Sequence, residues 1–245
     1  MNWSPPLRPA AYAEQALVTA ILDGTYTPGS LLPAERELAA RLGITRPTLR
    51  EALRRLECDG WVVVQQGKST LVKDFWRDGG LNVLGALVRY NRQLPAGFVQ
   101  NLLEVRLALA PAYTRAAVVQ APHAVVAQLS SHDQLADTPA AYAAFDWTLH
   151  HALTIVSGNP VFSLILNGFA GFYEDVARSY FQTDHARTTS CAFYADLLRF
   201  ATAGDADGAE NLTRQVMQES IGIWQAIASE VEAPAIQAAS MGTID

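Results

Sequence analysis

Three arginines at regular spacing offer the clearest chemistry in the chain. Arg46, Arg50 and Arg54 recur at i, i+4 and i+8, which places them along one face of a helix. Thr45 and Thr48 stand beside Arg46, where that helix is expected to begin. Arginine bonds guanine O6 and N7 in a bidentate manner, and hydroxyl groups at a helix N-terminus bond phosphate oxygens. This cluster indicates contact with double-stranded DNA.

Surface ion pairing is the alternative for the same arginines, since carboxylates lie nearby at Glu35, Glu37, Glu51 and Glu57. The secondary structure predicted around these arginines favours DNA binding over surface ion pairing. The pattern predicts one helix over about 33–42 and a second to about residue 59, with Thr45 capping the second. Gly43 ends the first helix. Helix, tight turn and helix with cations at the leading end is a helix-turn-helix arrangement.

A hairpin follows this helix pair directly. The run WVVVQQGKSTLVKDF contains two β-rich segments around Gln66, Gly67 and Lys68, and the glycine predicts a turn there. A hairpin after a helix-turn-helix is a wing, whose tip can reach phosphates or the minor groove. We therefore expect residues 1–78 to form a winged helix-turn-helix domain that binds DNA, with a helix over 9–23 packed behind the reader.

The distribution of charge fits this interpretation. The chain of 245 residues has a net charge of −6, but residues 1–78 carry ten basic and nine acidic residues, whereas 79–245 carry eight and fifteen. Both lysines, Lys68 and Lys73, lie in the wing. The acidic remainder is therefore not expected to contact DNA.

Cysteine content and hydropathy exclude several other classes of protein. Cys58 and Cys191 are too few for a disulfide framework or a metal knuckle. No signal peptide is evident, and no run approaches the roughly 18 apolar residues that a membrane span needs. The expectation is a cytoplasmic protein that does not enter a membrane.

The rest of the chain is predicted to be helical. Gly79 and Gly80 mark a joint, 79–95 forms a linker helix, and 96–233 forms an all-α bundle of six or seven helices, with a frayed tail at 234–245. Pro111 should kink or break the first bundle helix. The expected helices of the bundle are 96–119, 122–136, 138–156, 160–182, 187–203 and 205–229.

Two features of this bundle could bind a ligand. Asp146 and His150 are one helical turn apart, which is a spacing that can hold a metal. Ser220 lies on the inward stripe of the last helix, so its hydroxyl needs a polar ligand group or a second buried side chain as partner. An aromatic stripe runs along 160–182 and comprises Phe162, Ile165, Phe169, Phe172, Tyr173, Val176 and Tyr180. By itself, such a stripe favours ordinary core packing over a pocket.

The segment PGSLLPAERELAARLGITRPTLREALRRLECDGW resembles the signature of the GntR family of bacterial transcription regulators. The segments FWRDGGLNVLGALVRYN, NLLEVR, SGNPVFSLILNGFAGFY and ESIGIW extend the resemblance to the family's fatty acid metabolism regulator (FadR) branch across almost the whole chain. The resemblance implies a homodimer on a palindromic operator, repressing fatty acid degradation genes and activating synthesis genes, which long-chain acyl-coenzyme A releases from DNA. The operator contacts it implies are Arg36, Thr45, Arg46, Thr48, Arg50, Gln66, Gly67 and Lys68. The acyl-coenzyme A residues it implies are Arg106, Phe169, Tyr173, Tyr180, Tyr194, Glu219, Ser220 and Trp224.

A metal-dependent sensor of a small carboxylate metabolite is the alternative function. The wider family commonly completes an Asp/His pair such as Asp146 and His150 with two further histidines. The matching positions here fall near Tyr194 and Val216, which cannot replace histidine, so the expectation is a vestigial pair without metal. An enzyme such as an acyl-coenzyme A hydrolase is a further alternative, but the sequence offers no nucleophile with a neighbouring base and no phosphate loop. The chain is expected to be a regulator without catalytic residues or a cofactor.

Overall fold

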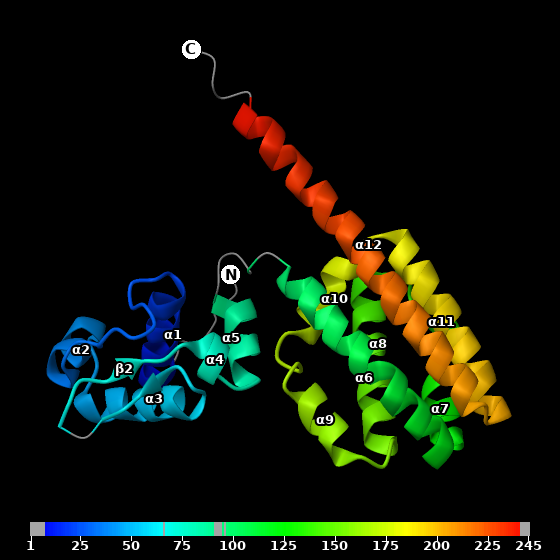
Figure 1. Cartoon of the computed structure of the whole chain (residues 1–245), viewed down its shortest axis with the longest axis horizontal. Coiled ribbons are helices and arrows are strands. Elements are labelled where there is room, and N and C mark those ends of the chain that lie inside the picture. Colours follow the sequence, from blue (N-terminus) through cyan, green and yellow to red (C-terminus); the bar gives the residue numbers. More distant parts are fainter. Residues whose placement is uncertain (1–7, 66, 91–94, 96, 241–245) are drawn as a thin grey trace. The chain divides into compact units, whose positions relative to one another are not determined.

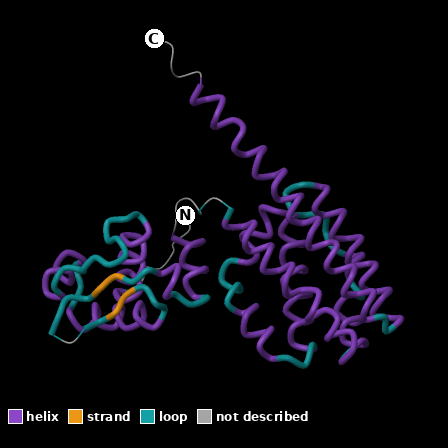
Figure 2. Tube along the Cα trace, in the orientation of Figure 1, coloured by secondary structure: helices purple, strands orange, loops and turns teal. Residues whose placement is uncertain are grey.

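The computed structural model describes residues 8–65, 67–90, 95 and 97–240, with side chains to residue 229. The chain divides into two compact units, Met1–Leu94 and Pro95–Asp245. Both are mainly helical (Figure 1), and in the described part of the chain the strands form a single small hairpin (Figure 2). The prediction of a mostly α protein, with a winged helix-turn-helix followed by a helical bundle, is confirmed.

The first unit contains a helix-turn-helix pair, α2 (Glu35–Leu42) and α3 (Arg46–Cys58), preceded by α1 (Pro9–Leu22) and followed by a short hairpin. Gly43 ends α2 in the left-handed conformation, with φ of 66°. Thr45 caps α3, since its side chain accepts a hydrogen bond from the backbone N–H of Thr48. Helix α2 begins at Glu35, two residues later than predicted, because the residue before it is still extended.

Apolar side chains from α1, α3 and the hairpin form the core of this unit. Leu17 of α1 and Leu49, Leu53 and Leu56 of α3 are at most 2% exposed. Each such side chain contributes about 1.5–3 kcal/mol by its burial. Because these apolar residues of α3 lie on one face of the helix, its arginines lie on the opposite, exposed face.

The hairpin pairs β1 (Val62–Val63) with β2 (Leu71–Val72) in antiparallel register, Val62 opposite Val72. Two helices follow, α4 (Phe75–Asp78) and α5 (Asn82–Tyr90), and α5 contacts α1. Gly60 connects α3 to the hairpin with φ of +87°, and a Cβ there would lie 2.6 Å from the Asp78 carbonyl oxygen. A side chain at this position is therefore excluded by both conformation and space.

Helices are the only regular secondary structure among the described residues of the second unit. Its first part contains α6 (Phe98–Gln120), α7 (Pro122–Leu129), a 3₁₀ turn (His132–Gln134) and α8 (Pro139–Val156). The rest contains α9 (Pro160–Asn167), α10 (Tyr173–Tyr180), α11 (Asp184–Ala203) and α12 (Ala206–Ser240). Residues 234–240 of the expected frayed tail belong to helix α12, and residues 241–245 lie outside the described residues. Helix α12 packs along α6 and α11, and these contacts enclose a core with Leu129, Leu149, Tyr194 and Leu197.

Several local predictions for the second unit differ from the structure. The helix predicted over 122–136 ends at Leu129 and is followed by the 3₁₀ turn, and the helix predicted to end at 229 continues to Ser240. Pro111 does not break the first bundle helix, since α6 continues through it as one helix and buries it. The prediction of one helix over 160–182 is wrong, because α9 ends at Asn167 and α10 begins only at Tyr173. Gly168 and Gly171 lie in the turn between them, where a helix is least favoured. The aromatic stripe is therefore split between two helices and their connection.

Candidate DNA-binding face and ligand pocket

The N-terminus of α3 carries a compact group of arginines and hydroxyls. Arg50 Nε lies 2.8 Å from Glu35 Oε2, and Arg46 lies 3.8 Å from the same oxygen, so one carboxylate holds both guanidinium groups. The Thr45 and Thr48 hydroxyls are 2.8 Å apart. Both arginine side chains are 57% exposed. Exposed ion pairs contribute about 0–1 kcal/mol, so a phosphate or a guanine can replace Glu35 at little cost.

The remaining predicted DNA contacts lie on other elements of the same unit. Arg36 is exposed in the first turn of α2 and has no acidic partner among the described residues. Gly67, with φ of +72°, and Lys68 are exposed at the tip of the hairpin. Gln66 lies outside the described residues. The structure thus brings together the α3 group, with Arg36 and the hairpin tip as separate exposed positions of the unit.

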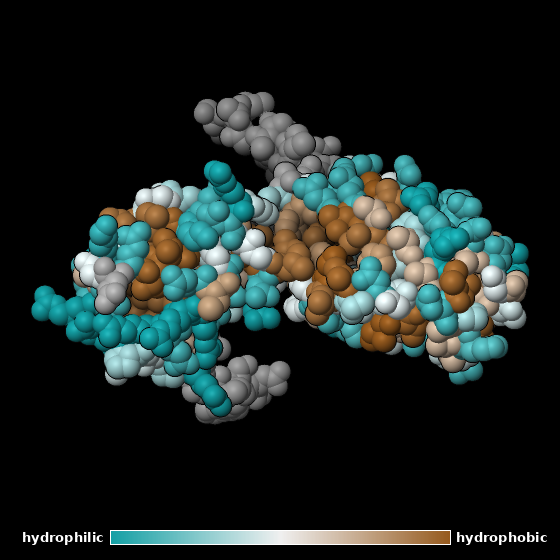
Figure 3. All heavy atoms as spheres, turned by 60° about the horizontal axis from the view of Figure 1, so that its bottom comes forward, coloured by the Kyte–Doolittle hydropathy of each residue, from teal (hydrophilic) through white to brown (hydrophobic). Residues whose placement is uncertain are grey.

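An apolar pocket opens within the second unit, and hydrophobic side chains also gather on one face of that unit (Figure 3). The pocket is lined by side chains from α6, α8, α9, α10 and α12, and from the connection between α9 and α10. Five predicted ligand residues line it, namely Arg106, Phe169, Tyr173, Tyr180 and Trp224. The other three do not. Tyr194 and Ser220 are buried behind the wall, and Glu219 is exposed on α12.

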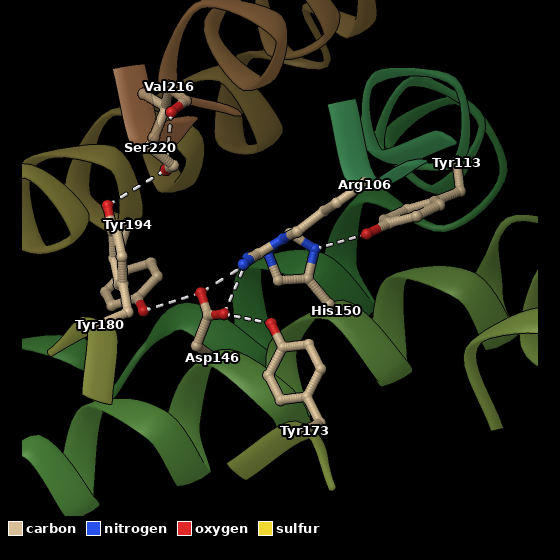
Figure 4. A network of polar contacts seen from close by, with 9 residues as sticks. All are labelled: Arg106, Tyr113, Asp146, His150, Tyr173, Tyr180, Tyr194, Val216 and Ser220. Carbon is tan, nitrogen blue, oxygen red and sulfur yellow. Dashed lines mark hydrogen bonds and ion pairs between the residues drawn. The ribbon is translucent and has the colours of Figure 1, made fainter. Parts of the chain in front are cut away.

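A buried polar network forms one side of the pocket (Figure 4). Arg106 Nη2 lies 2.7 Å from Asp146 Oδ2 and 2.5 Å from His150 Nε2. Tyr173 donates to Asp146 Oδ2 at 2.5 Å, and Tyr194 donates to Asp146 Oδ1 at 3.1 Å. The carboxylate therefore accepts from three donors on three different helices, α6, α10 and α11.

His150 connects this network to a residue that the sequence did not single out. Its Nδ1 lies 2.7 Å from the hydroxyl oxygen of Tyr113, which lines the pocket and is 4% exposed. Tyr113 follows Arg106 by seven residues, two turns along α6, so the two share a face of that helix. That spacing was the available signal, but it pointed to a shared face without showing that the face lines a pocket.

Burial and charge fix the protonation states of the network. Burial acts to raise the pKa of Asp146, but the charge of Arg106 and the hydrogen bond from Tyr173 outweigh it and hold that pKa below its ordinary range. Burial and the Arg106 charge both lower the pKa of His150, against the opposing effect of Asp146. Asp146 is therefore ionised, and His150 is neutral at pH 7.

The Asp146 and His150 pair is occupied by an internal cation. Both side chains point to the same guanidinium nitrogen of Arg106, and Tyr194 bonds the second carboxylate oxygen. In the described part of the chain, no cluster of three or more His, Cys, Asp or Glu side chains is placed to hold a metal. A metal ion would have to displace Arg106 from both of its partners. The arrangement suits an arginine far better than a divalent ion.

Ser220 has a protein partner on the pocket wall. Tyr180 donates to Ser220 Oγ at 3.2 Å, and Ser220 donates to the carbonyl oxygen of Val216 at 2.9 Å (Figure 4). Of the two partners expected for this buried hydroxyl, the second buried side chain is the one found. Tyr180 thereby joins the pocket to α12.

Comparisons with known proteins cover both units. The model of bacterial regulatory proteins of the gntR family matches residues 9–72, and the model of the FadR C-terminal domain matches residues 73–235. A protein of Shewanella halifaxensis named "Fatty acid metabolism regulator protein" is 41% identical over 91% of this chain and 93% of its own length. A Klebsiella pneumoniae protein of the same name is 39% identical over 88% and 90%. The chain belongs to the GntR family of transcription regulators and, within it, to the fatty acid metabolism regulators.

This membership makes the chain a DNA-binding regulatory protein, and the expectation that it is not an enzyme is confirmed by the family. A solved structure described as "Lar controls the expression of the Listeria monocytogenes agr system and mediates virulence" has the same fold. Its TM-score is 0.59 and its identity 17%, over 91% of this chain and 98% of the other. Among the described residues, no helix is both long and apolar enough to cross a membrane. The pocket lies wholly within the region matched by the FadR C-terminal domain.

Proposed function

We propose that long-chain acyl-coenzyme A releases this fatty acid metabolism regulator from DNA. It would repress degradation genes and activate synthesis genes. Relatives about 40% identical to it over most of the chain are named fatty acid metabolism regulators. The observation that carries the proposal is the pocket of the second unit, which is apolar over most of its wall and polar at one side.

The wall of the pocket suits a hydrocarbon chain. Leucine and valine side chains of α6 face aromatic side chains from α9, α10 and the connection between them. Each methylene transferred from water into such surroundings contributes about 0.8 kcal/mol. A long acyl chain therefore supplies far more affinity than a small carboxylate metabolite can draw from the same wall, and this favours the lipid effector over the metabolite.

Repression and release follow from two states of a homodimer. Two α3 helices related by a twofold axis read two half-sites of a palindromic operator in the major groove. We assign the operator contacts to Arg36, Thr45, Arg46, Thr48, Arg50, Gln66, Gly67 and Lys68. The ligand releases DNA by binding more tightly to the state that cannot engage both half-sites. Tyr180 is placed to transmit occupancy of the pocket to α12 through Ser220.

The deciding experiment is a gel shift with a palindromic duplex that the protein itself selects from random DNA. The complex is titrated with oleoyl-coenzyme A and, separately, with oleate. Release by the ester and much weaker release by the acid is expected. Tight binding that neither compound disturbs would refute acyl-coenzyme A as effector while leaving the DNA-binding function intact.

A further inference from the structure

The hydrogen-bond pattern around His150 determines which of its nitrogens carries the proton. A guanidinium group only donates hydrogen bonds, so His150 Nε2, 2.5 Å from Arg106 Nη2, must accept. A protonated imidazole would place two donors against each other, and the depressed pKa of His150 agrees with the neutral form. The ring hydrogen is therefore on Nδ1. From there it is donated to the Tyr113 hydroxyl oxygen, 2.7 Å away.

This tautomer leaves the Tyr113 hydroxyl with an unused hydrogen. Its oxygen already accepts from His150, and burial raises the pKa of Tyr113, so the hydroxyl stays protonated. Within the described part of the chain, no second polar atom contacts that hydroxyl. Tyr113 is 4% exposed and lines the pocket. A buried donor without an acceptor is costly, by about 1–3 kcal/mol, and its presence calls for a partner.

A second unused donor lies on the same wall. Arg106 Nε is buried without a hydrogen-bond partner among the described residues. The acceptors of the network are already engaged, because Asp146 receives Arg106, Tyr173 and Tyr194. The unsatisfied polar groups found on this wall are therefore donors, namely the Tyr113 hydroxyl hydrogen and the Arg106 Nε hydrogen. A complementary ligand has to bring an acceptor oxygen.

The charge balance of the network selects among acceptor oxygens. Arg106 is matched by Asp146 at 2.7 Å, and His150 is neutral, so no uncompensated positive charge faces the pocket. A carboxylate would enter such a site without a counter-charge, which burial penalises strongly. The carbonyl oxygen of a neutral acyl ester accepts the same hydrogen bond without that penalty.

We propose that Tyr113 donates a hydrogen bond to the acyl carbonyl oxygen of the effector and that Arg106 and His150 hold its hydroxyl in the donating orientation. This assignment rests on the proposed function, because it assumes that the effector binds in this pocket. It assigns a specific residue, Tyr113, to a specific atom of the ligand, the acyl carbonyl oxygen. The thioester carbonyl then lies at α6, and the alkyl chain extends along the apolar wall.

The test compares two ligands that differ only at the carbonyl group, in the full-length protein. Oleoyl-coenzyme A and its thioether analogue, in which a methylene replaces the carbonyl, are titrated by calorimetry into wild type and Tyr113→Phe. Wild type should bind the thioester about tenfold more tightly, as expected for one buried hydrogen bond. In Tyr113→Phe this ratio should fall to about one. Tyr142→Phe removes a buried hydroxyl that does not line the pocket and should keep the wild-type ratio.

A ratio that survives in Tyr113→Phe would overturn the assignment while leaving acyl-coenzyme A as effector. Failure of both ligands to bind wild type would instead refute the proposed function, and the assignment with it. If Tyr113→Phe does not fold, the assignment is tested in wild type by the infrared frequency of the carbonyl stretch of bound ¹³C-labelled thioester. A shift to lower frequency than in an apolar solvent supports a donor at the carbonyl, and an unshifted band overturns it. Oleate that binds wild type as tightly as the ester would overturn the charge argument.

Discussion

Loss of the Asp146 charge should destabilise the second unit more than any other single isosteric change in the network. Asp146→Asn keeps the size of the side chain, but it leaves the Arg106 guanidinium buried without its counter-charge. The Asp146 side chain is only 4% exposed and that of Arg106 19%, so water screens this pair little. The new amide group also directs a donor at a tyrosine hydroxyl or at Arg106, both of which are donors. Removing one partner of a buried ion pair typically costs about 3–5 kcal/mol, which is the loss expected here.

Hydrogen exchange of the α8 backbone amides under denaturant measures this loss, because it reports on the second unit separately from the first. Asp196→Asn serves as control, since its pair with Arg199 is exposed and should be worth at most about 1 kcal/mol. Arg106→Met should also cost several kcal/mol. The double variant of Asp146 and Arg106 should cost about 2–3 kcal/mol less than the two single losses combined. Additive losses, or a loss below about 1 kcal/mol in Asp146→Asn, would show that the pair is not coupled as argued.

Acidity gives an independent check of the same residue. The folded protein holds the pKa of Asp146 below its ordinary value of about 3.9, because the charge of Arg106 and the hydrogen bond from Tyr173 outweigh burial. A depressed pKa contributes stability that is fully present above the unfolded value and is lost as pH falls toward the folded one. The stability gap between wild type and Asp146→Asn should therefore be constant from about pH 5 upward and shrink below about pH 4. A gap that widens at acid pH would contradict this sign.

Three further outcomes are expected. Arg50→Ala should weaken specific operator binding by about 1–3 kcal/mol in a gel shift, whereas Arg55→Ala, whose arginine lies 3.7 Å from a glutamate of α1, should have little effect. Ser220→Asn should leave DNA binding intact but blunt release by acyl-coenzyme A, since the larger side chain displaces Tyr180 from the pocket wall; unchanged release would remove Ser220 from the link. Gly60→Ala should lower the melting temperature of the first unit, with a loss above about 1 kcal/mol, and a neutral result would contradict the close approach at that turn.

The first unit was predictable because its signals are local. Gly43 ends one helix, Thr45 caps the next, and the apolar residues of α3 recur at helical spacing. The helix boundaries and the buried face therefore depend on residues that are close in the sequence. The arginine group followed from the same spacing. The ion-pair alternative proved partly right as well, since Glu35 holds Arg46 and Arg50. Spacing showed which side chains share a face but not which carboxylate they contact.

The second unit was predictable in class but less so in detail. Pro111 remains inside α6 because the packing of that helix outweighs one lost backbone hydrogen bond, and the local rule carries no information about packing. The break between α9 and α10 was visible as Gly168 and Gly171, but the aromatic periodicity across them suggested continuity. The polar network was out of reach, because Arg106 and Asp146 are 40 residues apart and meet only through packing of α6 on α8.

A buried ion pair seldom adds net stability over a well-packed apolar pair, so the one beside the pocket needs another reason. The reason we favour is control of Tyr113. With Arg106 in place, His150 Nε2 must accept and Tyr113 must offer its hydrogen to the pocket. In Arg106→Met the imidazole is free to take the other tautomer, and Tyr113 can then donate to His150 in place of the ligand. The preference for thioester over thioether should therefore fall in Arg106→Met, although the substituted residue lies on the far side of the imidazole ring. Combination with Tyr113→Phe should lower the preference no further, because both changes remove the same donor. A larger loss in the double variant would mean that Arg106 Nε bonds the ligand directly. It would refute the proposal that Arg106 acts only by fixing the tautomer of His150.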